Sequence, residues 1–142
     1  MPMSSVSPPA RSSRHWLWPM LLLLGSITVA VAWLLAALTT GTQAGWMAVL
    51  AALEAAWMLR LGGFRAGPAR VAVAIIAMLL IALAANWGIA AAYIGGPMGL
   101  TPWESALRMG PHLAWTLLTL ANGLGEALWL AIAAVVAWRA AR

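Results

Sequence analysis

Two carboxyl groups lie inside long apolar segments of this 142-residue chain, which holds only three acidic residues. They belong to Glu54 and Glu126. Insertion scales put the cost of a charged side chain near the centre of a membrane helix at about 2.5–3.5 kcal/mol, so an acid there is usually neutral, paired or functional. We therefore expect each carboxyl to be neutral or paired, and each is a candidate for carrying protons within a bilayer.

A stripe of polar residues surrounds Glu126 at the spacing of one helix face. Intervals of four and three residues alternate along it, as in a helix packed against neighbours with a left-handed crossing. The stripe consists of His112, Thr116, Thr119, Gly123 and Glu126, with Asn122 beside it. A polar line across half a bilayer suits a proton relay or a path for a polar substrate. Thr and Asn also form hydrogen bonds between membrane helices, and the pattern alone leaves both interpretations open.

Asn86 lies inside the third apolar run, and we expect it to hydrogen-bond to one of the two carboxyls, with Glu54 the poorer candidate because Asn86 lies nearer the outer side. Glu54 and Glu126 lie on segments predicted to run in the same direction across the membrane, so their carboxyls are expected at similar depths. Carboxyls that faced each other would share a proton and titrate as a pair. The structural alternative is that each acid donates its proton to a backbone carbonyl or to an asparagine.

The elements that must hold these side chains are four apolar runs, at about residues 18–38, 44–61, 71–94 and 112–138. Each approaches or exceeds the roughly 20 residues that a helix needs to cross a hydrocarbon layer of about 30 Å. A composition of 64% hydrophobic and 8% charged residues excludes a soluble globular domain, because such domains carry about 25% charged residues. The sequence predicts an all-α integral membrane protein in which residues 15–142 form one antiparallel bundle of four transmembrane helices.

The basic residues are all arginines, and seven of the eight flank the same side of the predicted spans. They are Arg11, Arg14, Arg60, Arg65, Arg70, Arg139 and Arg142. Basic residues are retained on the cytoplasmic side of a membrane, so both termini are predicted to be cytoplasmic. The composition, rich in alanine and arginine, suggests a bacterial protein and hence the inner membrane. Residues 1–14 are rich in Ser and Pro and are expected to form a disordered cytoplasmic tail.

The loop before the fourth run predicts a short helix on the outer surface of the membrane. The segment Thr101-Pro102-Trp103-Glu104 matches a capping box with proline at the first helical position. We expect an amphipathic helix over about residues 102–109, with Trp103 and Leu107 directed toward lipid.

The sequence offers little for catalysis or cofactor binding. Without cysteine or lysine there is no thiol nucleophile, no Cys-based metal site and no Schiff base. His112 and Glu104 alone are too few for a metal site. Nucleophile–base pairs, phosphate-binding glycine loops and dinucleotide fingerprints do not occur, and no basic stripe with exposed aromatics points to nucleic acid. We expect neither enzymatic activity nor a cofactor.

Small residues at intervals of four predict close helix contacts along two of the spans. Ala84, Gly88 and Ala92 form one line, and Ser26 with Ala30 forms a shorter one. These features favour a non-catalytic accessory or assembly subunit that contacts the lipid bilayer and either a membrane-protein partner or further copies of itself. The alternative is a small oligomeric proton-coupled transporter of a hydrophobic or cationic solute, which uses the two intramembrane glutamates and the polar stripe.

Overall fold

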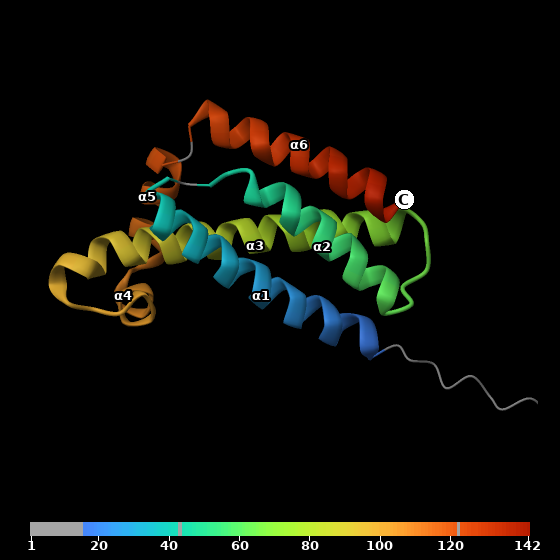
Figure 1. Ribbon diagram of the computed structural model, residues 1–142, viewed down its shortest axis with the longest axis horizontal. Helices are drawn as coiled ribbons and strands as arrows, with labels where there is room; N and C mark the ends of the chain where they lie inside the picture. Colours follow the sequence, from blue (N-terminus) through green and yellow to red (C-terminus); the bar gives the residue numbers. More distant parts are fainter. Residues whose placement is uncertain (1–15, 43, 122) are drawn as a thin grey trace, which may run out of the picture.

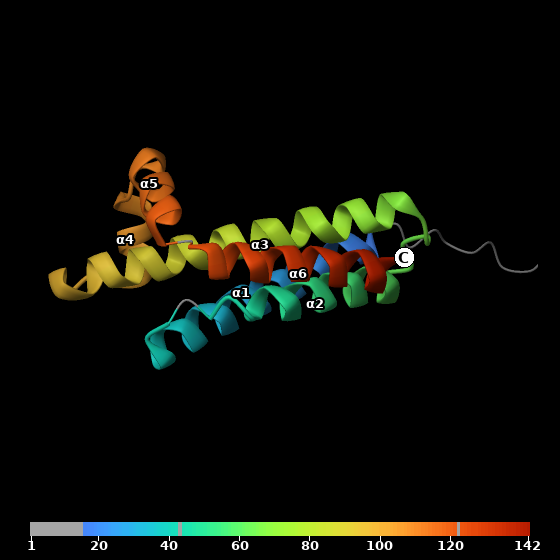
Figure 2. The same ribbon diagram turned by 90° about the horizontal axis from the view of Figure 1, so that it is seen from above.

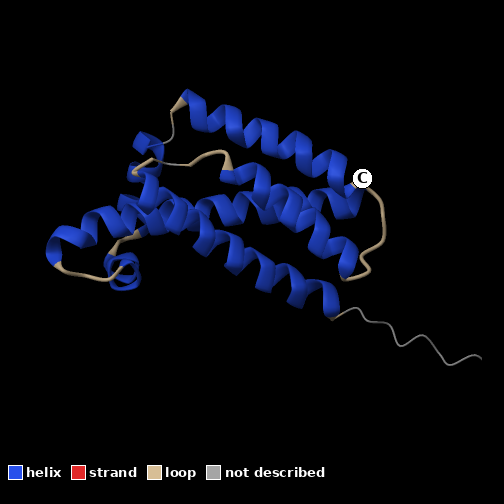
Figure 3. Cartoon of the chain, viewed as in Figure 1, coloured by secondary structure: helices blue, strands red, loops and turns tan. Residues whose placement is uncertain are grey.

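The computed structural model describes residues 16–42, 44–121 and 123–142, and Figure 3 shows helices and connecting loops throughout that part of the chain. Three helices are long and apolar enough to cross a membrane, which indicates a membrane-embedded protein. These helices are α1 (Leu17–Thr40), α3 (Pro68–Gly95) and α6 (Leu124–Ala141). The remaining elements are α2 (Met47–Leu61), the single turn η1 (Gly96–Met98), α4 (Pro102–Arg108) and α5 (Pro111–Ala121).

The short helix α2 lies at the centre of the packing. Figure 1 shows α2 between α1 and α6, and Figure 2 shows α3 along one side of these helices. α2 contacts α1, α3 and α6. Alanines fill most of its buried positions, namely Ala48, Ala51, Ala52, Ala55 and Ala56. Small side chains let neighbouring backbones approach closely, and close approach is how helices associate in lipid. With 15 residues, α2 is only about 22 Å long. Contacts with its neighbours, more than its own hydrophobicity, therefore keep it in place.

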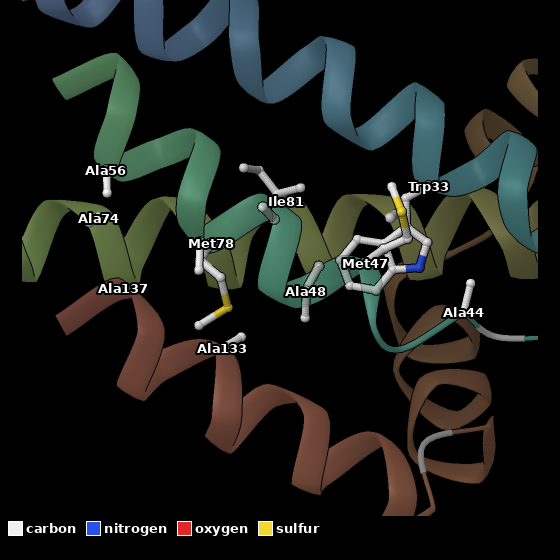
Figure 4. Packing of buried hydrophobic residues seen from close by; sticks show 14 of the residues in the cluster. Trp33, Ala44, Met47, Ala48, Ala56, Ala74, Met78, Ile81, Ala133 and Ala137 are labelled. Atoms are coloured by element: carbon white, nitrogen blue, oxygen red, sulfur yellow. The ribbon is translucent and has the colours of Figure 1, made fainter. Parts of the chain in front are cut away.

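A few large side chains complete this alanine-rich core. Figure 4 shows the indole of Trp33 beside Met47, and Met78 directed toward Ala133. Trp33 is 1% exposed, and Met78 is fully buried. On α6, Ala133 and Ala137 are four residues apart and both fully buried. α6 therefore packs on the core through a narrow line of small residues.

The fourth apolar run folds as two helices, so the prediction of one continuous helix over residues 112–138 is wrong. α5 ends at Ala121, and α6 begins at Leu124 with Gly123 as an extended N-cap residue. The glycines at positions 123 and 125 explain the break, because each disfavours a helix by about 1 kcal/mol relative to alanine. The sequence Asn-Gly before α6 also favours a turn. Figure 2 shows α5, which packs on α3, projecting from the side of the other helices.

The other predicted helices agree with the structure to within three residues at each end. The capping box that begins α4 is confirmed: Glu104 N donates to Thr101 Oγ1 at 3.3 Å, and Thr101 N donates to Glu104 Oε2 at 3.0 Å. The hydrogen bond from the Thr101 backbone to the carboxyl group, and after it the Thr101 side chain, lower the pKa of Glu104 below its usual range. Trp103 and Leu107 are 72% and 69% exposed. The predicted tail, residues 1–14, lies outside the described residues.

Five arginines gather at one end of the helices, which we name the arginine end. α2 and α6 finish there and α3 begins there, so these elements bring Arg60, Arg65, Arg70, Arg139 and Arg142 to the same level. The start of α1 is fixed at this end by an edge-to-face contact between the rings of Trp18 and Phe64, whose centroids are 4.9 Å apart. The arginine distribution read from the sequence thus corresponds to one end of the folded molecule.

Arg70 joins three elements at the arginine end. Its Nε donates to the backbone oxygen of Ala141 at 2.6 Å, Nη2 to that of Arg142 at 3.0 Å, and Nη1 to that of Phe64 at 3.3 Å. The last carbonyls of a helix lack donors within the helix, and a cation beside them is favoured by the helix dipole. Arg70 is buried and therefore caps α6 while tying it to the beginning of α3 and to the loop after α2.

Replacing Arg70 by leucine should lower the free energy of unfolding by about 1–3 kcal/mol, because buried backbone carbonyls at the arginine end would lose their donors. The measurement is a denaturant titration of the purified protein in detergent micelles. Arg65→Leu is the control, since Arg65 is exposed. Equal free energies of unfolding for the two variants would contradict the capping role.

Candidate functional site

Glu54 lies midway along α2, and its carboxyl group packs against a glycine of α1. A Cβ atom built on Gly25 would overlap Glu54 Oε1 and would lie 2.8 Å from Glu54 Cδ and 3.0 Å from Met58 Cγ. Any residue other than glycine at position 25 would therefore collide with the carboxyl. Both oxygens of Glu54 are buried and have no hydrogen-bond partner among the described residues. Because buried polar groups are nearly always paired, this carboxyl is a candidate for a functional proton or ligand site.

Glu126 occupies the first turn of α6 and also rests on a glycine. A Cβ atom built on Gly45 would overlap Glu126 Oε2 and would lie 2.8 Å from Glu126 Cδ. Gly45 is buried two positions before α2 begins, so the carboxyl lies where α2 and α6 both start. Helix N-termini carry unpaired N–H groups and a partial positive charge, and this position therefore suits a group that carries or develops negative charge.

The two carboxyls lie at different levels, so the prediction of similar depths is wrong. Glu54 lies nine positions beyond Gly45, the residue that Glu126 contacts. Nine residues correspond to on the order of 14 Å along a helix. The two groups also face different neighbours, since Glu54 lies against α1. The helix break is the reason: it moves Glu126 from the middle of a long predicted span to the start of α6. A proton shared between the two carboxyls has no geometric basis.

The polar stripe predicted around Glu126 does not form one helix face. His112, Thr116 and Thr119 lie on α5, which the break separates from α6. The Thr116 hydroxyl donates to the His112 carbonyl at 3.0 Å, and the Thr119 hydroxyl donates to the Thr116 carbonyl at 2.8 Å. His112 is exposed in the first turn of α5. Asn122, the other predicted member, lies outside the described residues. The stripe would form one face only on an unbroken helix, and the residues lie on two helices instead.

Asn86 bonds to its own helix instead of to a carboxyl. Its Nδ2 donates to the Ala82 carbonyl at 2.9 Å, and its Oδ1 has no partner in the part of the chain that the structure describes. The structure does bring Asn86 together with Thr119, because both line one cleft between α3, α5 and α6. Of the predicted site residues, these two are therefore neighbours, whereas Glu54 and Glu126 each occupy a separate position.

A groove between α1 and α3 is a feature that the sequence analysis did not predict. It consists of two adjoining clefts, of about 380 and 610 Å³, which share Ala84. In the second cleft Leu34 is the residue of α1, and a further wall comes from α4 and from Thr101 before it. Small residues line it on both helices, namely Ser26, Ala30, Ala77, Ala84 and Gly88. Trp87 also lines it, and the indole N–H of Trp87 has no acceptor among the described residues. The lines of small residues were visible in the sequence, but nothing in the sequence indicated that they face each other. We name this feature the α1–α3 groove.

Comparison with protein-family models, with curated proteins and with solved structures finds no match to this chain. Three features of the structure are therefore the candidate sites: the carboxyls on Gly25 and Gly45, the α1–α3 groove, and the cleft beside Asn86.

The contact between Gly25 and Glu54 predicts that substitutions at these two positions are coupled. Gly25→Ala should lower the free energy of unfolding by about 1–3 kcal/mol, because the added methyl group displaces a carboxyl from a close-packed interface. In a Glu54→Ala background the same change should cost less than about 0.5 kcal/mol, since the space is then free. Denaturant titration of the four proteins in micelles completes the double-mutant cycle.

Gly88→Ala is the matched control for this cycle. A Cβ atom built on Gly88 would lie 3.6 Å from Leu34 Cδ1, which is an ordinary contact, so this change should have little effect in either background. Strictly additive effects of Gly25→Ala and Glu54→Ala would show that the carboxyl does not occupy the space beside Gly25.

Proposed function

We propose that this chain is an accessory or assembly subunit of the bacterial inner membrane, and that its α1–α3 groove receives a transmembrane helix of a partner protein. The groove is the observation that carries the proposal. Small residues along both of its walls allow the backbone of a third helix to approach closely. Close packing of this kind is a main source of helix association in lipid, where no hydrophobic effect drives helices together.

The length of the groove favours a helix over a lipid as its occupant. On α1 the groove extends from Trp18 to Leu34, a separation of sixteen positions. This corresponds to about 24 Å of a hydrocarbon core that is about 30 Å thick. An acyl chain belongs to one leaflet and covers about half of that thickness. A transmembrane helix crosses both leaflets and can fill the groove along its whole length.

An unpaired donor at one end of the groove supports the same occupant. Trp87 Nε1 is buried there without an acceptor among the described residues, beside Thr101 and Trp103. A partner helix that ends at this level carries carbonyl groups without intrahelical donors. One of these carbonyls, or a hydroxyl of the partner, would accept the indole hydrogen bond.

The proposal includes four transmembrane helices, namely α1, α3 and α6 together with the shorter α2. α2 is shorter than a typical span, and its contacts with α1, α3 and α6 supply the apolar surroundings that its own sequence lacks. Retention of basic residues in the cytoplasm supports a cytoplasmic location for the arginine end, where α1 begins and α6 ends. Four spans and this orientation account for the alternation of the arginines along the sequence.

Site-specific photo-crosslinking in cells that produce the chain naturally tests the proposed contact. A small diazirine amino acid replaces Leu80, which is 60% exposed in the groove, or Val135, which is 55% exposed on α6. We expect the Leu80 position alone to form an adduct with a transmembrane segment of one partner, mapped by mass spectrometry. Ala84→Leu, which fills the groove, should reduce that adduct by about tenfold, consistent with the 1–3 kcal/mol cost of overpacking.

Ala127→Leu, at an exposed position of α6, is the matched substitution and should leave the adduct unchanged. Equal crosslinking from both positions, adducts with lipid alone, or an adduct only with a second copy of this chain would each refute the accessory role.

A second candidate is a proton-coupled transporter of a hydrophobic or cationic solute, and it is favoured by the carboxyls seated on Gly25 and Gly45. Uptake of tetraphenylphosphonium into proteoliposomes under a pH gradient measures this activity. If the chain is a transporter, Glu126→Gln and Glu54→Gln should each abolish uptake, because the amide exchanges no proton, while Glu104→Gln should retain it. Equal uptake by all four proteins, the wild type included, would end this candidate.

A further inference from the structure

A second cleft lies on another face of α3, where α3 meets α5 and α6. Its volume is about 520 Å³, within the range of small-molecule sites. Its lining residues are Leu79, Ala82, Leu83, Asn86, Trp115, Thr119 and Leu130. We name it the Asn86 cleft. The residues of α3 that line it differ from those that line the α1–α3 groove, so the two sites lie on different faces of the same helix.

The orientation of the Asn86 amide leaves an acceptor unused. Asn86 is 8% exposed, and its Nδ2 donates to the Ala82 carbonyl at 2.9 Å. If the amide were rotated by half a turn, Oδ1 would face the Ala82 carbonyl, and two acceptors would lie together. The hydrogen bond therefore identifies the nitrogen and the oxygen of the amide. Oδ1 then has no donor among the described residues. Buried acceptors are nearly always paired, and this unpaired one lines a cleft large enough for a ligand.

The other lining residues restrict what can supply the donor. Among the described residues, no acidic or basic side chain lines the cleft, so a charged ligand would be buried there without a counter-charge. The Thr119 hydroxyl already uses its proton on the Thr116 carbonyl at 2.8 Å. Leucine and alanine side chains form most of the remaining wall, and the 65% exposed ring of Trp115 forms part of it. The occupant must therefore be neutral and mostly apolar, with a hydrogen-bond donor.

We propose that the Asn86 cleft binds a neutral amphiphile through a hydroxyl group, which donates to Asn86 Oδ1 while the hydrocarbon part lies against Leu79, Leu83 and Leu130. The break between α5 and α6 forms this site, because a straight helix over residues 112–138 would not project from α3 as α5 does. Such a hydroxyl can come from a free long-chain alcohol or from the headgroup of a diacylglycerol. The proposal does not depend on the accessory role, since the α1–α3 groove is on another face.

Photolabelling of the full chain in lipid nanodiscs tests this proposal. The probe is hexadecan-1-ol with a diazirine in its chain and a terminal alkyne, and the comparison probe is its methyl ether, which has the same shape but no donor. We expect the alcohol to label residues of the Asn86 cleft about tenfold more than the ether, as for the loss of one buried hydrogen bond. Competition by unlabelled hexadecanol or by dioleoylglycerol distinguishes the two sources of the hydroxyl.

Two variants connect the labelling to the acceptor and to the cleft. Asn86→Leu has a similar volume and removes an unpaired polar group, so the protein should fold, and alcohol labelling should fall to the level of the ether. Leu83→Trp fills the cleft and should suppress labelling by both probes. Labelling that is equal for alcohol and ether in the wild type, or that is unchanged by either variant, overturns the proposal. If labelling persists in Leu83→Trp even though it falls in Asn86→Leu, the amphiphile lies outside the cleft, and this result also overturns the proposal.

Discussion

Close packing of α2 against three longer helices is the constraint on which the rest of the structure depends. α2 is short, rich in alanine and interrupted by Glu54, so it has little tendency to remain in hydrocarbon alone. Its neighbours provide apolar surroundings, and its small side chains let their backbones come near. Because the helices are in such close contact, the space that a glutamate carboxyl occupies cannot also hold a methyl group from the neighbouring helix. This explains why Glu54 and Glu126 each meet a glycine, Gly25 and Gly45, at the helix contact. The same packing that holds α2 thus fixes where the two buried acids can be.

The two ends of α6 are held in different ways. At the arginine end, the guanidinium of Arg70 binds the last carbonyls of α6 and ties them to α3. At the other end, α6 begins after a break, with Glu126 in its first turn. α5 is the element beyond that break, and among the helices its contacts are mainly with α3. Local stability follows the density of such contacts, so α5 is the less firmly held of the two helices.

The sequence was sufficient for features that depend on local chemistry. The capping box at Thr101, the lengths of the apolar runs and the gathering of arginines at one end all follow from propensities and from the cost of charge in lipid. The break at Gly123 was missed because the apolar composition continues through it, and hydrophobic length is a poor guide to helix continuity. The polar stripe then appeared as one face, although Thr116 and Glu126 belong to different helices. Gly123 at the break and Gly125 in the first turn of α6 were the available signal.

The α1–α3 groove and the Asn86 cleft could not have been predicted, because each depends on which faces of α3 meet which neighbours. α3 separates them: its Ala77, Ala84 and Gly88 line the α1–α3 groove, and its Leu79, Leu83 and Asn86 line the cleft with α5 and α6. A helix with two such faces is suited to contacts of two kinds. The face with Ala77, Ala84 and Gly88 is the one proposed to receive the backbone of a partner helix, a contact that needs close approach and no donor. The face with Leu79, Leu83 and Asn86, whose amide oxygen has no donor among the described residues, is the one proposed to bind hydrocarbon with one hydroxyl. Because Arg70 holds the end of α6 and α5 packs mainly on α3, we expect any adjustment of the Asn86 cleft to an occupant to involve α5 more than the packing around α2.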